Sequence, residues 1–483
     1  MWPMREQLLL KNFFSPSGIM VTILAASLVS LLLVTHPYLG FAVGILPLVA
    51  WFGTASKKNA LFLFLLLLPY HATAVFTENF IGITGVKPFN LLAVFLLVMF
   101  LFHNGRVFRT EDAIEKKAMW VFGIYLVIFT VAVVRSLDYL HIIYMIAPDK
   151  YHSAPVNHIL SFLVRPALFS LSFIYVLKHI RTEKEINQCV DVICGAIFIL
   201  SCIVLVVTVA NITRITLSRA YLDEIISSFF SMHRNAIGSI YITCIPLLVL
   251  RALGGKTFPV INYTAAGAAV LLLQSRSTIA VFLGGTIFLL WFAKRWKAMA
   301  FFAGIFLLFF LFWLPDFLAR VLSIGLHSGT IDAVLTGRVD NLWVPLLKDR
   351  FNNPEHLFFG VGFYSILVSP AYLQHDIFQV NHPHNAFLEL FLDCGLIVFS
   401  VFVFYLAMFL KKALSLAKKA DTLTGWALFT CLITYLVGTI SGRSFYPSRN
   451  TMYLFPIIAL LINYFRLHLS AGKYKEAPFP NGD

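Results

Sequence analysis

The chain of 483 residues is 59% hydrophobic and only 12% charged, well below the roughly 25% charged residues of an average soluble domain. This composition excludes a water-soluble fold. The formal net charge of +14 would suggest nucleic acid as the partner of a soluble protein, but in a membrane protein excess lysine and arginine orients the helices, so no nucleic acid is implied.

Apolar runs of about 17 residues or more recur along nearly the whole chain, and each is long enough to cross a hydrocarbon core of about 30 Å. We expect helices, because a lipid-exposed backbone must satisfy its own hydrogen bonds. The predicted fold class is an all-α polytopic membrane protein with about 12–14 transmembrane helices. The spans are predicted near residues 18–35, 38–53, 59–76, 88–104, 117–135, 159–180, 189–210, 235–252, 258–273, 277–294, 297–315, 385–410, 424–440 and 450–466.

These spans divide the chain into four parts. Residues 1–315 hold transmembrane helices 1–11, residues 316–384 form one large loop or cap, residues 385–466 hold helices 12–14, and residues 467–483 form a tail. Lysine-rich connections favour the cytoplasmic side. This rule places both termini in the cytoplasm and the large loop on the outer face, as membrane-bound cap structure.

The two predicted faces differ in their cations. The outer connections hold few lysines but many arginines, namely Arg135, Arg165, Arg214, Arg219, Arg234, Arg276, Arg320, Arg338, Arg350, Arg443 and Arg449. Orientation alone does not explain this bias. Arginine offers a planar fork of donors that suits bidentate contact with phosphate or carboxylate, so the outer face is predicted to bind an anion.

Two of these arginines stand in notable places. Arg276 lies between two spans with almost no loop to lift it into water, which favours a functional role over that of a snorkelling anchor. Arg338 lies in the large loop, where a solvated surface arginine would be the usual interpretation. Arg443 and Arg449 flank the last outer loop, where each could extend a phosphate-binding ring or simply anchor a helix end.

The strongest local signal is the segment from Asn381 to Leu396, where the large loop turns into a span. His384 would lie at the mouth of this helix, and a neutral imidazole there could take a proton from an attacking hydroxyl. Alternatively, His384 and Asn385 form only an N-terminal helix cap. His382 is interpreted as loop structure with a chance of substrate contact.

Two carboxyl groups follow on the same helix. Glu389 and Asp393 are spaced i,i+4 within apolar surroundings, so they share a face and need partners. Arginine is the expected partner, and structural pairing is favoured over catalysis for both.

No metal site or cofactor is predicted. The chain shows no P-loop, dinucleotide fingerprint, zinc-binding His-Glu-x-x-His or Asp-x-Asp motif, so a nucleotide-sugar donor is not expected. The six cysteines lie within apolar runs without metal-type spacing.

The chain resembles the bacterial O-antigen ligase and Wzy-type polysaccharide polymerase superfamily. The resemblance is carried by Ser275-Arg276, Thr336-Gly337-Arg338 with Trp343, Phe359-Gly-Val-Gly362, and His384-Asn385 followed by Leu388-Glu389 and Gly395-Leu396. Each piece is weak alone, but their combination in this order is fairly specific. They cover roughly the last half of the chain, and the first half matches only in hydropathy.

The resemblance implies a metal-independent glycosyltransferase of the GT-C kind in the bacterial inner membrane, with its active site on the periplasmic face. Its donor would be a glycan linked to undecaprenyl diphosphate. By this resemblance Arg276 and Arg338 would clamp the diphosphate, and His384 would act on the acceptor hydroxyl.

Three functions are compared. An O-antigen ligase would transfer the glycan to a lipid A-core acceptor, and this is the first interpretation. A Wzy-type polymerase would transfer it to another lipid-linked glycan, and nothing in the sequence separates the two. A flippase would also bind a polyprenyl diphosphate, but its arginines should line a cavity from both faces, which the one-sided arginine bias does not favour.

Overall fold

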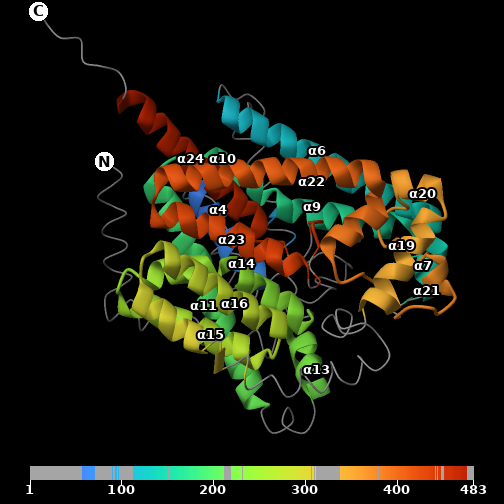
Figure 1. Cartoon of the computed structure of the whole chain (residues 1–483), viewed down its shortest axis with the longest axis horizontal. Coiled ribbons are helices and arrows are strands. Elements are labelled where there is room, and N and C mark those ends of the chain that lie inside the picture. Colours follow the sequence, from blue (N-terminus) through green and yellow to red (C-terminus); the bar gives the residue numbers. More distant parts are fainter. Residues whose placement is uncertain are drawn as a thin grey trace, which may run out of the picture. The chain divides into compact units, whose positions relative to one another are not determined.

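The computed structural model describes residues 57–70, 112–146, 153–211, 219–230, 232–305, 338–378, 380–440, 442, 444–447 and 451–475, with a few isolated positions besides. Every regular element within these ranges is a helix (Figure 1). The chain forms two compact units, one of residues 1–105 with 228–231 and one of the remainder. The described helix of the first unit is α4 (Lys57–Leu67), which ends in the 3₁₀ turn η1 (Leu68–Tyr70).

The second unit holds the further elements, except for the last three residues of α13, which belong to the first unit. They are α6 (Ala113–Arg135), η3 (Ser136–Tyr139), α7 (Leu140–Ile146), α8 (Pro155–Ile159), η4 (Leu160–Val164), α9 (Arg165–Ser170), α10 (Ser172–His179), α11 (Glu183–Ala210), α13 (Arg219–Phe230), α14 (Arg234–Ala252), α15 (Thr257–Leu272), α16 (Arg276–Phe292), η5 (Val339–Trp343), α19 (Val344–Phe351), α20 (Pro354–Phe359), α21 (Pro370–Leu373), α22 (Ala386–Ala420), α23 (Leu423–Thr439) and α24 (Leu454–Lys475).

Within the described ranges, five helices are long and apolar enough to cross a membrane: Ala113–Ile146, Pro155–His179, Glu183–Ala210, Arg234–Ala252 and Ala386–Ala420. Shorter apolar helices cover Lys58–Tyr70, Thr257–Leu272, Arg276–Phe292, Trp296–Ile305, Leu423–Thr439 and Leu454–His468. The protein is therefore an all-α polytopic membrane protein, as predicted. The predicted spans 18–35 and 38–53, and most of 88–104, lie outside the described residues, so the number of 12–14 helices stays a prediction.

Contacts between helices fix their directions in the second unit. Gly238 of α14 packs against Thr278 of α16, and Gly285 of α16 lies near Ile245 of α14. Gly285 also faces Thr434 of α23, and Phe292 of α16 stacks on Trp426 of α23. These contacts make α14 and α16 parallel and α23 antiparallel to both. The starts of α14 and α16 and the end of α23 therefore lie at one end of the bundle, which we call the site end.

The end of the bundle opposite the site end is rich in lysine. Lys178, in the last turn of α10, and Arg181, just after this helix, both pair with the fully buried carboxylate of Glu115 near the start of α6, at 2.5 and 2.8 Å. Arg466 of α24 lies 3.4 Å from the same carboxylate. Because α22 also ends in lysines here, this lysine end has the cation pattern expected of a cytoplasmic face.

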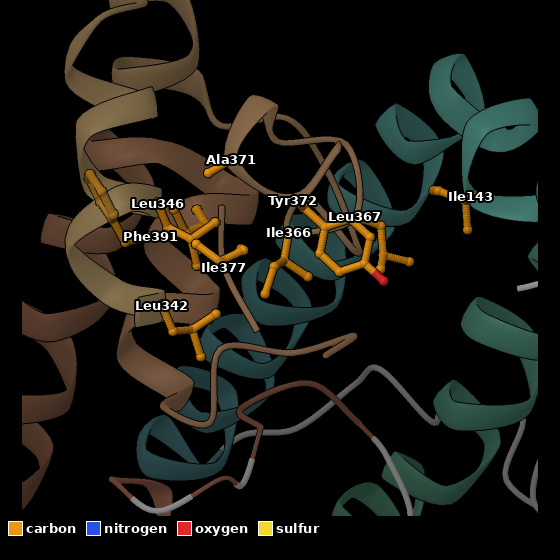
Figure 2. Packing of buried hydrophobic residues seen from close by; sticks show 10 residues of the cluster. Ile143, Leu342, Leu346, Ile366, Leu367, Ala371, Tyr372, Ile377 and Phe391 are labelled. Carbon is orange, nitrogen blue, oxygen red and sulfur yellow. The ribbon is translucent and has the colours of Figure 1, made fainter. Parts of the chain in front are cut away.

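A cap covers part of the site end. Its core joins α7, η5, α19 and α21 to the first turns of α22, and buries Ile143, Leu342, Leu346, Ile366, Leu367, Ala371, Tyr372, Ile377, Phe391 and Leu392 (Figure 2). Leu342 and Leu346, one turn apart, present the same face to Ile377 and Phe391. Residues 140–146, far away in the sequence, thus belong to the cap as well.

Three glycines let the backbone pass between the cap and the spans. Gly395 has φ +76° and breaks the regular geometry of α22, so the carbonyls of Leu392 and Asp393 lose helical donors. The amides of Val361 and Gly362 donate to these carbonyls instead, at 3.3 and 2.9 Å.

There is no room for side chains at this crossing. A Cβ on Gly395 would lie 2.5 Å from the backbone nitrogen of Gly360, and one on Gly362 would lie 2.7 Å from the backbone nitrogen of Ser136. The glycines of the Phe359-Gly-Val-Gly362 motif and Gly395 therefore have a common physical cause, which is close contact between backbones.

Candidate functional site

The loop before α22 is tied to the helix that follows Arg338. Arg338 directly precedes η5, and one turn later the indole Nε1 of Trp343 donates to the carbonyl of Pro383 at 2.8 Å. Pro383 lies between His382 and His384. This bond ties η5, which follows Arg338, to the histidine segment.

The two histidines form a compact pair. His384 adopts φ +56°, and its backbone amide donates to Nδ1 of His382 at 3.2 Å. The ring centroids are 4.0 Å apart. Because Nδ1 of His382 accepts this bond, the proton of the neutral ring belongs on Nε2. The His382 ring thus holds the backbone of His384 in the loop.

Asn385 begins α22. Its side-chain oxygen accepts from the amides of Phe387 and Leu388, at 3.0 and 3.2 Å, so Asn385 is the N-cap of the helix. The cap fixes the start of α22 and leaves the imidazole of His384 in front of the helix, outside its hydrogen-bonded turns.

Gly442, from the loop after α23, faces the His384 ring. It has φ +118°, and a Cβ there would lie 3.2 Å from Nδ1 of His384. Two hydrogen bonds hold the residues that follow Gly442. Tyr446 N–H donates to Ser444 Oγ at 3.1 Å, and the Tyr125 hydroxyl donates to the Phe445 carbonyl at 2.9 Å. Gly442 therefore forms a fixed wall of the site.

The electrostatics keep both rings neutral. Burial, together with the neighbouring His382, Arg338 and His233, lowers the pKa of His384 to about 3. Burial, Arg338 and His233 likewise lower the pKa of His382 to about 4. Burial also lowers the pKa of Arg338. Arg338 and His233 thus act electrostatically on the histidine pair, and the Arg338 guanidinium contributes positive potential there.

The start of α14 is a part of the site that the sequence did not reveal. His233 is the N-cap of α14, and its Nδ1 accepts from the Asn235 amide at 3.2 Å. Asp223 lies 3.3 Å from Nε2 of His233 and 2.9 Å from Nε of Arg234. The signal in the sequence was Arg234 in the outer arginine set, but His233 had no distinguishing pattern.

Arg276 is the first residue of α16. It follows Ser275, whose hydroxyl accepts from Thr278 at 2.8 Å, and Thr278 packs on Gly238, one turn after Arg234. Arg276 therefore lies at the site end, at the level where α14 begins. The structure thus assigns Arg276, Arg338 and His384 to one end of the bundle.

The two carboxyl groups of α22 have different partners. Asp393 is buried and accepts from the hydroxyl and the amide of Ser365, at 2.6 and 3.2 Å. Arg350, also buried, interacts electrostatically with Asp393 and donates to the Ser365 carbonyl at 3.3 Å. Glu389 hydrogen-bonds the side chain of Ser444. Asp393 thus ties α22 to the cap, and Glu389 ties it to the Gly442 loop.

Arg443 and Arg449 lie outside the described residues. In the described ranges, no group of three or more histidine, cysteine, aspartate or glutamate side chains lies close enough together to hold a metal ion. Asp223 pairs with Arg234, whereas Arg338 and the neutral imidazoles of His382 and His384 suit an anionic ligand.

Comparison with known protein families points to the same part of the chain. Residues 262–403 match the O-antigen ligase family model. This match confirms the resemblance seen in the sequence, and it includes Arg276, Arg338, the paired glycines and His384. It supports a membrane enzyme of the O-antigen ligase or polymerase type, with glycan-lipid substrates. The search of curated proteins found no matching protein.

Proposed function

We propose that this protein is a metal-independent membrane glycosyltransferase that transfers a glycan from undecaprenyl diphosphate to an acceptor hydroxyl. The observation that carries the proposal is the Trp343–Pro383 bond, which holds Arg338 beside His384 inside the segment that matches the ligase family. The proposed location is the bacterial inner membrane, with both termini cytoplasmic and the site end periplasmic.

In this proposal Arg276 and Arg338 bind the diphosphate. Negative charge grows on the leaving diphosphate as the glycosidic bond breaks, and guanidinium groups fixed near a low-dielectric boundary stabilise that charge strongly. Arg338 already lies in a partly desolvated place, since burial lowers its pKa. The arginines thus supply the charge neutralisation that a divalent cation supplies in other transferases. The polyprenyl chain stays in the lipid throughout.

His384 serves the acceptor. The acceptor oxygen forms a bond to the anomeric carbon, the bond from that carbon to the diphosphate oxygen breaks, and the diphosphate leaves with the electron pair. The hydroxyl proton passes to the imidazole of His384. A pKa of about 3 makes His384 a weak base in the free protein, but a bound diphosphate offsets the Arg338 charge that lowers this pKa, so the ring becomes more basic when substrate is present.

The first choice of acceptor is a lipid A-core sugar, which makes the protein an O-antigen ligase. A polymerase would place a second lipid-linked glycan in the same position. Both reactions share the donor and the proton transfer, so the described residues serve either one.

Reconstitution tests the proposal. The purified protein is placed in liposomes with a lipid-linked oligosaccharide and either a lipid A-core acceptor or no further acceptor, and the products are separated on a gel. A single band shift that requires the lipid A-core acceptor supports the ligase. A ladder of products that forms without this acceptor contradicts the ligase and supports the polymerase. Absence of any covalent product contradicts a transferase. Transfer is expected to persist in EDTA, and its loss there contradicts metal independence.

Variants test the residue roles in the same assay. Arg276→Ala, Arg338→Ala and His384→Ala are each expected to abolish transfer while the protein still expresses and folds. Lys348→Ala removes an exposed cation from α19 in the same cap and is the matched control, with wild-type activity. Full activity of either arginine variant would contradict the proposed binding of the diphosphate by Arg276 and Arg338.

A further inference from the structure

The cap presents exposed aromatic side chains where it meets the spans. Phe358 and Phe359, the last residues of α20, are 44% and 56% exposed. Apolar residues at the adjacent parts of α6 and α22 are similarly exposed, between 37% and 51%. We call these six residues the outer strip: Val131, Val134, Phe358, Phe359, Leu396 and Ile397.

The backbone segments that carry the outer strip are in direct contact. Arg135, at the end of α6, donates from Nη1 to the carbonyl of Phe359 at 2.5 Å. On the other side, a Cβ on Gly395 would lie 2.5 Å from the carbonyl carbon of Phe358, so α20 also contacts the break in α22. Figure 1 shows α20 beside the end of α6 and the first part of α22. The two phenylalanines therefore continue the surfaces of two membrane-spanning helices.

One cation borders the strip. The half-buried Arg135 lies beside Phe359, and it interacts electrostatically with His356, one turn earlier on α20. Burial lowers the pKa of His356, and Arg350 and Arg135 lower it further. Aromatic rings in line with lipid-facing residues, with a guanidinium at their edge, match the layering of a lipid leaflet, in which acyl chains lie below phosphate groups.

We infer that the end of α20 inserts Phe358 and Phe359 into the membrane leaflet at the site end, with Arg135 at the level of the lipid phosphates. The partner is the phospholipid surface, because the strip is continuous with α6 and α22, whose exposed apolar residues already face lipid in a membrane-spanning protein. A protein partner on this strip would have to displace lipid from both spans.

The insertion fixes the height of the cap above the bilayer. The cap core is packed on the first turns of α22, which begin directly after His384 (Figure 2). An anchored α20 therefore keeps Arg338 and His384 near the phosphate level. That consequence rests on the proposed function, since a lipid-linked diphosphate lies at the same level, but the insertion itself does not.

Depth measurements test the insertion without any activity assay. Spin labels are attached to cysteines placed at positions 358, 359, 355 and 397 in turn, and the full-length protein is reconstituted in phosphatidylcholine–phosphatidylglycerol liposomes. Labelled wild-type protein gives the background from native cysteines. The ratio of collision rates with oxygen and with a water-soluble nickel chelate reports depth.

We expect the ratio at positions 358 and 359 to be several-fold higher than at 355, which replaces the exposed Glu355 at the start of α20, and to approach that at the lipid-facing position 397. Ratios at 358 and 359 equal to that at 355 would overturn the inference, as would labels shielded from both reagents.

A second measurement uses the unmodified chain. A phospholipid with a diazirine in its acyl chain is photolysed in the same liposomes, and adducts on the 351–359 segment are expected by mass spectrometry. Adducts on α22 without any on Phe358 or Phe359 would contradict the insertion.

Discussion

Replacing Gly442 by alanine adds a single atom, the Cβ, beside the histidine pair. The new Cβ would lie 3.2 Å from Nδ1 of His384 and 3.9 Å from Cε1 of His382. The first distance is shorter than an ordinary contact between a carbon and a ring nitrogen, so the imidazole must move by a few tenths of an ångström or the loop must retreat. The loop is held by Ser444 and Phe445, so we expect the ring to move.

Two costs follow from this geometry. Alanine at φ +118° is strained by roughly 1–3 kcal/mol, which a protein with the usual margin of stability tolerates. The larger effect is on transfer, because displacing a reacting group by about 1 Å costs on the order of 10²-fold in rate. With a smaller shift we expect the turnover rate to fall by roughly ten- to a hundred-fold.

The assay compares Gly442→Ala with Gly123→Ala, a helical glycine with nothing within 4 Å of the added Cβ. Both proteins are reconstituted, and turnover and KM for the lipid-linked donor are measured. We expect Gly123→Ala to match wild type, and Gly442→Ala to lose turnover with little change in KM or in folding. Wild-type turnover for Gly442→Ala would refute the position of this loop against His384.

Other predictions test separate parts of the account. Since His384 has a pKa of about 3, it stays neutral from pH 8 down to pH 5, and kcat/KM should show no acid limb near pH 6.5; an acid limb of the wild-type protein with its midpoint near pH 6.5 would contradict the shifted pKa. Gly395→Ala places a Cβ 2.5 Å from the backbone of Gly360, so little folded protein should survive size-exclusion chromatography, whereas Gly195→Ala, with free space around it, should elute as wild type. Glu115→Ala leaves three cations around an empty buried position and should cost roughly 3 kcal/mol or more, seen as earlier thermal unfolding in detergent; unchanged unfolding would mean that this cluster is not stabilising.

The helices of this protein follow from its sequence because hydropathy and length decide a membrane span locally. The span predicted at 117–135 corresponds to α6, and the span at 424–440 to α23. The ends of the helices are harder to predict, because polar residues at a helix end are tolerated on either side of the membrane interface. Thus α22 runs to Ala420, ten residues beyond its predicted end.

The site was only partly predictable. The local pattern around His384 correctly placed a helix start, and Asn385 forms its cap. Contacts between distant segments were not predictable from one sequence, because no local rule pairs His233 with the His384 loop. The same holds for Glu389, for which an arginine partner was expected and Ser444 is found.

Glycines give the clearest example of this limit. Gly360, Gly362 and Gly395 belong to the sequence pattern that resembles the family, and that pattern alone gives no physical reason for them. Their reason is tertiary, since each meets backbone from a different segment. A sequence shows that glycine is present but not what approaches it.

The central claim is that guanidinium groups at the site end bind a departing diphosphate beside His384. Its most direct test is the single-turnover release of undecaprenyl diphosphate from a lipid-linked glycan by reconstituted Arg338→Ala, with Lys348→Ala as the control. Losing one preorganised charge donor should slow release by about 10²–10³-fold, while the control releases at the wild-type rate. Release by Arg338→Ala as fast as by wild type would contradict the claim.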